Sequence, residues 1–168
     1  PDGGSLHREF LADGSSDPRP AVAESLLAAL GDDADPIVVY SGYEKRMLCD
    51  LAQRVPERAA ELGRLRERLV DLLPVVRSSV YHPGFRGSFS LKAVGPALAP
   101  QIRYDDLAGV ADGTAAAAAF ARIAARETGA EEEQSLRAQL LAYCERDTLA
   151  LLEVHRALWT LAAAQNSR

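Results

Sequence analysis

Lysine and cysteine are scarce in this 168-residue sequence, and each scarcity argues against a class of site. The only lysines are Lys45 and Lys92, and the formal net charge is −5, which argues against a broad basic face for gripping duplex DNA. This charge stays compatible with binding of a short single strand, because a few arginines and backbone groups can hold such a strand. Cys49 and Cys144 lie far apart without a C-x-x-C spacing, which indicates neither a zinc site nor a redox pair. We expect both cysteines to be buried as small apolar residues.

Long apolar runs are also missing, and with them any sign of a membrane-spanning segment. No stretch reaches the ~20 apolar residues that cross a bilayer, and the alanine run at residues 115–119 is soon followed by Arg122. The polar, glycine-bearing residues 1–5 lack the charged-then-apolar order of a secretory signal. These absences predict a cytoplasmic protein.

What the sequence does contain is the composition of an ordinary globular protein. Apolar residues make up 48% of the chain and charged residues 26%, which suits one domain over residues 1–168 with a real core. The order of strands and helices in the first half favours an α/β sandwich. The elements predicted there are a strand at residues 6–12, a helix at 21–30, a strand at 36–40 covered on both faces, and a helix at 43–55.

The second half is predicted to be mainly helical. Leucines at helical spacing favour a helix over residues 56–73, and an irregular, proline- and glycine-bearing stretch is expected at 75–87. A short helix within residues 88–97 begins at Ser90, and Gly95 and Pro96 are expected to end it early. Two further helices are predicted at residues 114–127 and 132–163.

A carboxylate lies in the middle of the apolar stripe of the last predicted helix. Apolar residues follow spacings of three and four on both sides of Asp147, which places its side chain on the face that should be buried. A buried charge is costly unless it is paired or binds a metal ion. Two interpretations stay open, a metal ligand or a structural carboxylate that bonds an arginine or a backbone donor.

Two motifs, in order along the chain, carry a resemblance to a known family. Residues 143–148 read Tyr-Cys-Glu-Arg-Asp-Thr, and residues 37–45 form a β-branched run and a turn, with Glu44 opening a helix. They resemble the third and second motifs of the tyrosine type of DEDD 3′-5′ exonucleases. The chain is also similar to a bacterial domain family of unknown function that is often found behind a RecB/Cas4-type nuclease domain. That similarity rests on residues 68–73, 87–92, 112–113 and 140–145.

The resemblance implies an α/β, ribonuclease H-like domain with a mixed sheet and flanking helices. It implies hydrolysis of phosphodiesters at single-stranded DNA or RNA ends by two divalent ions, Mg²⁺ or Mn²⁺. Asp147 and Glu44 would be metal ligands, and Tyr143 would orient the attacking water, so these three residues are the catalytic candidates. An N-terminal RecB/Cas4-type nuclease domain of the same protein is the implied partner.

Two departures from the family pattern limit what the resemblance implies. Glu44 stands where the family usually has aspartate, so its reach is one methylene longer. The family's first motif, Asp-x-Glu, should precede the strand expected at residues 6–12, but Asp2 is followed by glycines. We therefore expect the first strand or strands of the fold to be missing, in a C-terminal part of a longer chain or in a degenerate member. Too few carboxylates then remain for rapid hydrolysis.

Five other polar residues are weaker candidates. Ser88, Ser90 and Lys92 would present hydroxyls, N–H groups and a cation to a phosphate at a helix start, although capping explains the serines as well. His82 is a candidate for contact with a base, and an exposed loop histidine is the alternative. Asp71 is a possible site residue or a carboxylate at a helix end.

Three functions stay open at this point. The first is an exonuclease-like domain that acts on single-stranded ends, and the second is a non-catalytic module of the same fold that binds nucleic acid or positions a partner nuclease domain. The third is a soluble domain in which Asp147 is merely ion-paired.

Overall fold

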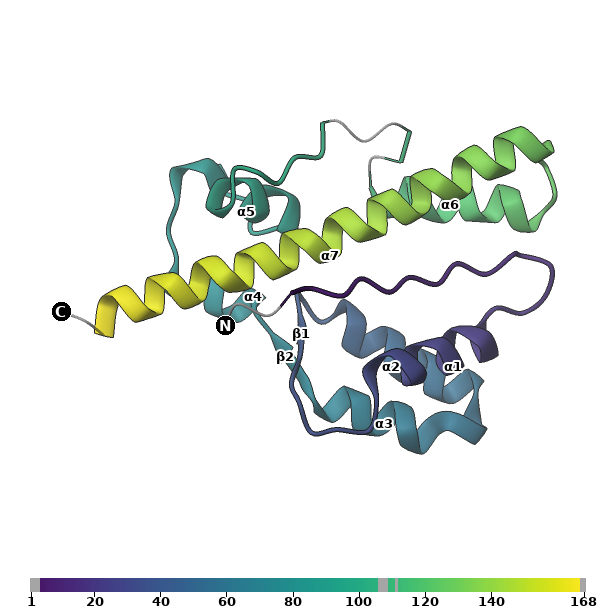
Figure 1. Ribbon diagram of the computed structural model, residues 1–168, viewed down its shortest axis with the longest axis horizontal. Helices are drawn as coiled ribbons and strands as arrows, with labels where there is room; N and C mark the ends of the chain where they lie inside the picture. The colour runs from purple at the N-terminus through teal and green to yellow at the C-terminus, as the bar shows by residue number, and fades with distance from the viewer. Residues whose placement is uncertain (1–3, 106–108, 111, 167–168) are drawn as a thin grey trace.

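The computed structural model describes residues 4–105, 109–110 and 112–166, and Figure 1 shows how its elements are arranged. A small parallel sheet lies beside three helices of the first half, and one long helix runs along the molecule. The α/β class expected from the sequence is confirmed. The elements are α1 (Arg19–Leu30), β1 (Ile37–Val39), α2 (Tyr43–Arg54), η1 (Pro56–Arg58), α3 (Ala59–Glu67), β2 (Leu69–Asp71), α4 (Leu73–Ser79), η2 (Pro83–Phe85), α5 (Leu91–Leu98), α6 (Gly113–Ala124) and α7 (Ala130–Asn166).

The two strands form one parallel pair, so both end at the same edge of the sheet. A parallel pair needs a crossover connection, which α2, η1 and α3 provide here. The backbone N–H of Leu72 donates to the Val39 carbonyl at 3.0 Å and extends the pairing past β2. The aligned residues are Ile37 with Leu69, Val38 with Val70 and Val39 with Asp71.

Helices α1, α2 and α3 enclose the core of the first half. Its buried residues are Ala23, Leu48, Val55, Leu62 and Leu65. Helices α1 and α2 confirm the helices expected at residues 21–30 and 43–55, with Gly31 ending α1 at a φ of 62°. The single helix expected at residues 56–73 is wrong, because α3 ends at Glu67 and the next residues form β2. Pairing with β1 overrides the helical spacing of the leucines.

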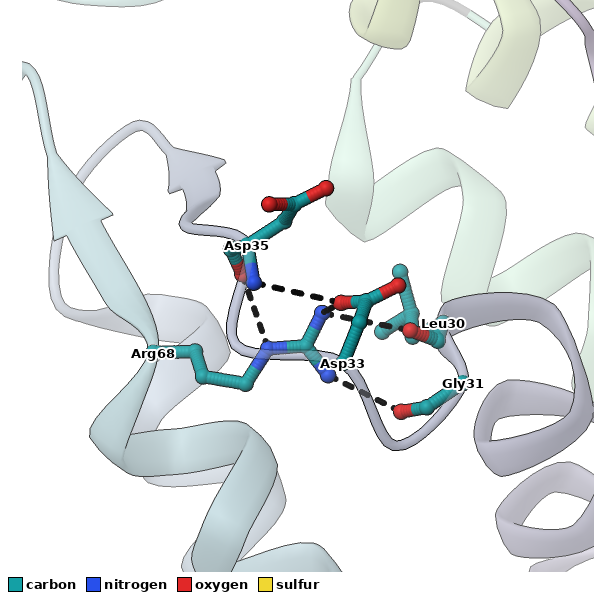
Figure 2. A network of polar contacts seen from close by, with 5 residues as sticks. All are labelled: Leu30, Gly31, Asp33, Asp35 and Arg68. Carbon is teal, nitrogen blue, oxygen red and sulfur yellow. Dashed lines mark hydrogen bonds and ion pairs between the residues drawn. The ribbon is translucent and has the colours of Figure 1, made fainter.

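Arg68 ties the amino ends of the strands to the end of α1, as Figure 2 shows. Its Nε donates to the Asp35 carbonyl at 2.8 Å and its Nη1 to the Gly31 carbonyl at 2.9 Å. Its Nη2 donates to the Leu30 carbonyl at 3.2 Å and to Asp33 Oδ1 at 2.7 Å. Only 13% of the Arg68 side chain is exposed, so four bonds satisfy a largely buried cation.

The irregular stretch expected at residues 75–87 contains helix α4 and the short η2, so that expectation is wrong in part. Pro74 lies in the first turn of α4, where its missing N–H costs nothing. Helix α5 starts after Ser90 as expected but continues past Gly95 and Pro96 to Leu98. A β-carbon at Gly95 would lie 3.4 Å from the Ala150 β-carbon, so α5 packs closely on α7 there.

Helix α7 contributes to every core outside the first half. With α6 it buries a cluster of Val110, Ala119, Ile123, Leu140 and Tyr143. Further along, Val154 joins the core that β1, α4, η2 and α5 share. Among the helices that the structure describes, α7 included, none is both long and apolar enough to cross a bilayer.

The strand expected at residues 6–12 is wrong. This segment extends beside α7 without pairing with a strand (Figure 1). Arg137 of α7 donates to the carbonyls of Leu11 and Ala12, each at 2.8 Å. A side chain therefore supplies the hydrogen bonds that a neighbouring strand supplies in a sheet.

The two cysteines are less buried than expected. Cys49 is half-buried, and its Sγ accepts a hydrogen bond from Arg66 Nη1 at 3.6 Å. Cys144 is exposed and borders a surface pocket that Leu11, Phe120 and Leu140 also line. The expectation of burial is wrong for both.

Candidate functional site

A pocket lies at the carboxyl ends of β1 and β2. Ligands of open α/β sheets characteristically bind outside this edge, where loops follow the strands. The cavity has a volume of about 770 Å³. It is lined by Tyr40, Ser41, Tyr43, Glu44, Leu73, Arg77, Gly87, Ser88, Phe89, Ser90, Leu91, Asp147, Thr148 and Leu151.

Glu44 brings a carboxylate to the lining of this pocket. It lies in the first turn of α2, where the helix dipole favours a negative charge. Its Oε2 is buried and has no hydrogen-bond partner within the described part of the chain. Burial raises the pKa of Glu44, its own backbone N–H acts in the opposite direction, and the charge of Asp71 adds to the increase. One of the two oxygens of the Glu44 carboxyl group is therefore buried without a hydrogen-bond partner among the described residues.

Asp71 is the paired carboxylate at the same edge. Its Oδ1 accepts hydrogen bonds from the backbone N–H of Ser41 at 2.7 Å and of Leu73 at 2.9 Å. Ser41 has a φ of 90°, a strained conformation for a residue with a side chain. Asp71 thus fixes the turn that carries the chain from β1 to Glu44.

Asp147 reaches the pocket from α7. The Tyr104 hydroxyl donates to Asp147 Oδ1 at 2.9 Å, across 43 residues of sequence. Tyr143 lies one turn earlier, buried in the α6–α7 core rather than in the pocket lining. Burial, and then the charge of Asp147, raises the pKa of both tyrosines. The Lys92 ammonium lies 4.7 Å from the Tyr143 ring centroid and 5.6 Å from that of Tyr104.

The structure brings some of the expected site residues together and separates others. Glu44, Asp147, Ser88 and Ser90 line the pocket. Tyr143 lies in the α6–α7 core with the Lys92 ammonium over its ring, and the Asp71 carboxylate accepts from the Ser41 N–H. His82 is outside the pocket lining, where its Nδ1 accepts from the Gly84 N–H at 3.1 Å and caps η2.

Several residues that line or support the pocket were not predicted from the sequence. Arg77 reaches the pocket from α4, and the proline two residues into that helix was the missed signal. Tyr40 donates through its hydroxyl to the Phe89 carbonyl at 2.8 Å, and burial raises its pKa to about 12. Tyr104 bonds Asp147 from a distant loop, for which the sequence holds no signal.

The pocket has the right ligand type for Mg²⁺ or Mn²⁺ but too few ligands for a pair of ions. Glu44 offers a free buried oxygen, whereas Tyr104 already occupies one oxygen of Asp147 and two N–H groups occupy one of Asp71. Over residues 4–105, 109–110 and 112–166, no three His, Cys, Asp or Glu side chains group closely enough to hold a metal ion. The described residues alone therefore do not fit the paired-ion site.

Comparison with known proteins gives one match. The family model for a domain of unknown function, DUF2779, matches residues 1–90, more than half of the chain. The matched part contains the carboxyl ends of both strands, Glu44 and Arg77, whereas Asp147 lies beyond it. No curated protein and no solved structure matches the chain.

Proposed function

The chain belongs to the DUF2779 family, and we propose that its pocket binds the 3′ end of a single-stranded nucleic acid, as part of a DEDD-type exonuclease site. The observation that carries the proposal is the meeting of Glu44 and Asp147 in one pocket, although they come from α2 and α7. They occupy the second and third acidic positions of the resemblance. Had Glu44 and Asp147 been on opposite faces of the molecule, the proposed strand-end site would have had no basis.

The other lining residues suit a strand end. Tyr43 is 56% exposed and offers a ring on which a base can stack, while Phe89 forms a second aromatic wall. Ser88 and Ser90 line the pocket, where the Ser88 hydroxyl donates to Ser90 Oγ at 3.2 Å, and the N-terminus of α5 follows directly. Carboxylates accept hydrogen bonds from a free sugar hydroxyl, which an internal nucleotide lacks at its 3′ oxygen. The combination favours a terminal nucleotide over a duplex.

Hydrolysis by a pair of Mg²⁺ or Mn²⁺ ions needs carboxylates beyond Glu44 and Asp147. When bound, such ions would activate water and stabilise the leaving oxygen. We therefore expect this 168-residue chain to bind strand ends without rapid turnover.

A second candidate is a binding module that performs no hydrolysis and positions a strand for another nuclease. Tyr104 favours it, because its hydroxyl occupies an oxygen of Asp147 that a metal ion would need. The two candidates share the pocket and differ in whether strand ends are ever cleaved.

Binding and cleavage are tested separately with the full 168-residue chain. Fluorescence anisotropy with single-stranded DNA and RNA of about ten nucleotides measures binding, with a blunt duplex and a 3′-phosphorylated strand as controls. We expect the free 3′ hydroxyl end to bind most tightly. Equal affinity for all four ligands, or no binding, would overturn the proposal.

Cleavage is followed with the same strands in Mn²⁺, using Asp147→Asn as the matched control. We expect no multiple turnovers with either protein. Repeated turnover that Asp147→Asn abolishes would establish an active nuclease and exclude the module that only binds.

A further inference from the structure

Arg77 is the single cation among the pocket-lining residues that the structure describes. It lies in the last turn of α4, beside the same cavity as Glu44 and Asp147. A pocket that holds two carboxylates repels anions, so one cation at its wall marks where an anionic group of a ligand can be accepted.

Aromatic packing holds the Arg77 side chain. The guanidinium carbon lies 6.0 Å from the Phe89 ring centroid, within the range of a cation–π contact. The Phe89 backbone is fixed in turn by the Tyr40 hydroxyl, which donates to its carbonyl at 2.8 Å. Within the described part of the chain Arg77 makes this ring contact but neither an ion pair nor a hydrogen bond, so its N–H donors are available to a ligand.

We propose that Arg77 binds the 5′-phosphate of the terminal nucleotide, with the hydroxyls of Ser88 and Ser90 completing the phosphate site. A guanidinium presents paired N–H donors that match two phosphate oxygens. Glu44 and Asp147 line the same cavity as this phosphate site. This inference rests on the proposed function, because it assigns a role within the same pocket.

Arg46 offers a matched control for Arg77. It is also an exposed arginine over an aromatic ring, 5.5 Å from the Tyr43 centroid, but it does not line the pocket. Arg77→Gln and Arg46→Gln therefore remove the same charge and the same kind of ring contact. We expect Arg77→Gln to weaken single-strand binding about tenfold and Arg46→Gln to weaken it less than about twofold. Equal losses would overturn the assignment.

A direct readout on the wild-type chain keeps the inference separate from folding defects and from the proposed function. The Nε–H signal of Arg77 is followed by NMR during titration with thymidine 5′-monophosphate and, as the phosphate-free control, thymidine. We expect a saturable shift with the nucleotide only.

The outcomes separate the two proposals. No shift with thymidine 5′-monophosphate overturns the phosphate site even if the oligonucleotide binds. A shift without oligonucleotide binding supports the phosphate site and removes the strand-end function.

Discussion

The two ends of the β1–β2 sheet hold polar groups of opposite character. At the amino end, Arg68 is largely buried and makes four hydrogen bonds to the turn that follows α1 (Figure 2). At the carboxyl end, Glu44 has a buried carboxylate oxygen that meets no hydrogen-bond partner among the described residues, and it lines a cavity of about 770 Å³. A satisfied network stabilises the fold, whereas an unsatisfied buried group lowers stability unless a ligand meets it. The difference supports the proposal that the binding site lies at the carboxyl end.

Arg68→Met should produce the largest loss of stability, because it takes the donor from three backbone carbonyls and removes the ion pair with Asp33, whose Oδ1 keeps only the Asp35 N–H among these bonds. We expect the free energy of unfolding to fall by roughly 3 kcal/mol. Arg64→Met is the control, since Arg64 lies in the last turn of α3, one turn before Arg68, and its 3.8 Å ion pair with Asp32 is exposed. Its cost should stay below about 0.5 kcal/mol in urea denaturation. Similar costs for the two variants would contradict the structural role of Arg68.

Asp71→Ala should have the next largest effect. It removes the acceptor for the N–H groups of Ser41 and Leu73, so we expect a loss of about 2 kcal/mol. Asp71→Asn keeps an oxygen at the same position and should recover about half of that loss. Thermal or urea unfolding measures both variants. An alanine variant as stable as the wild type would show that the turn holds itself.

Glu44→Gln should change stability in the opposite direction. The folded protein has a raised pKa for Glu44, so it favours the neutral form that glutamine mimics. Wild type should lose stability relative to Glu44→Gln as the pH rises from the ordinary glutamate pKa of 4.5 through the raised folded value. Above that window we expect Glu44→Gln to be more stable by about 1 kcal/mol.

Glu61, in the first turn of α3, provides a control because its pKa is shifted in the opposite direction. Its own backbone N–H and then Arg58, at 3.2 Å, lower its pKa, so ionised Glu61 stabilises the fold. Glu61→Gln should therefore lower stability at neutral pH, and the difference should vanish as the pH falls. Urea denaturation across this pH range measures both variants. If both glutamine variants shift stability in the same direction, the contrast between paired and unpaired carboxylates is wrong.

Tyr104→Phe should have the smallest effect. It removes one hydroxyl that donates to Asp147, whose carboxylate can then be solvated from the pocket, so we expect a loss of about 0.5 kcal/mol. Tyr81→Phe is the control, because Tyr81 is 90% exposed and should change nothing. Calorimetric melting of the two variants under one buffer condition tests the difference. A loss as large as that of Asp71→Ala would make Tyr104 a main support of the fold.

Local signals in the sequence were sufficient for part of this picture. A β-branched run between turn residues predicted β1, and helical spacing predicted α2 and placed Glu44 in its first turn. The apolar stripe around Asp147 predicted α7 and the placement of a carboxylate on its inner side. These features depend on neighbours within a few residues.

Features that depend on distant partners were not predictable. Residues 69–71 follow a leucine pattern of helical period, and only pairing with β1 makes them a strand. Residues 6–12 alternate like a strand but meet the side chain of Arg137 instead of a sheet edge. The bond from Tyr104 to Asp147 likewise joins segments that no local pattern connects.

Amide chemical-shift mapping during titration with a single-stranded oligonucleotide tests the contrast between the two ends of the sheet most directly. We expect the shifted amides to be those of residues 41–44, 88–91 and 147–151, which border the pocket. The amide signals of residues 30–35 and of Arg68, at the amino end of the sheet, should not shift. Shifts centred on Arg68, or none at saturating oligonucleotide, would contradict the assignment of the carboxyl end as the binding site.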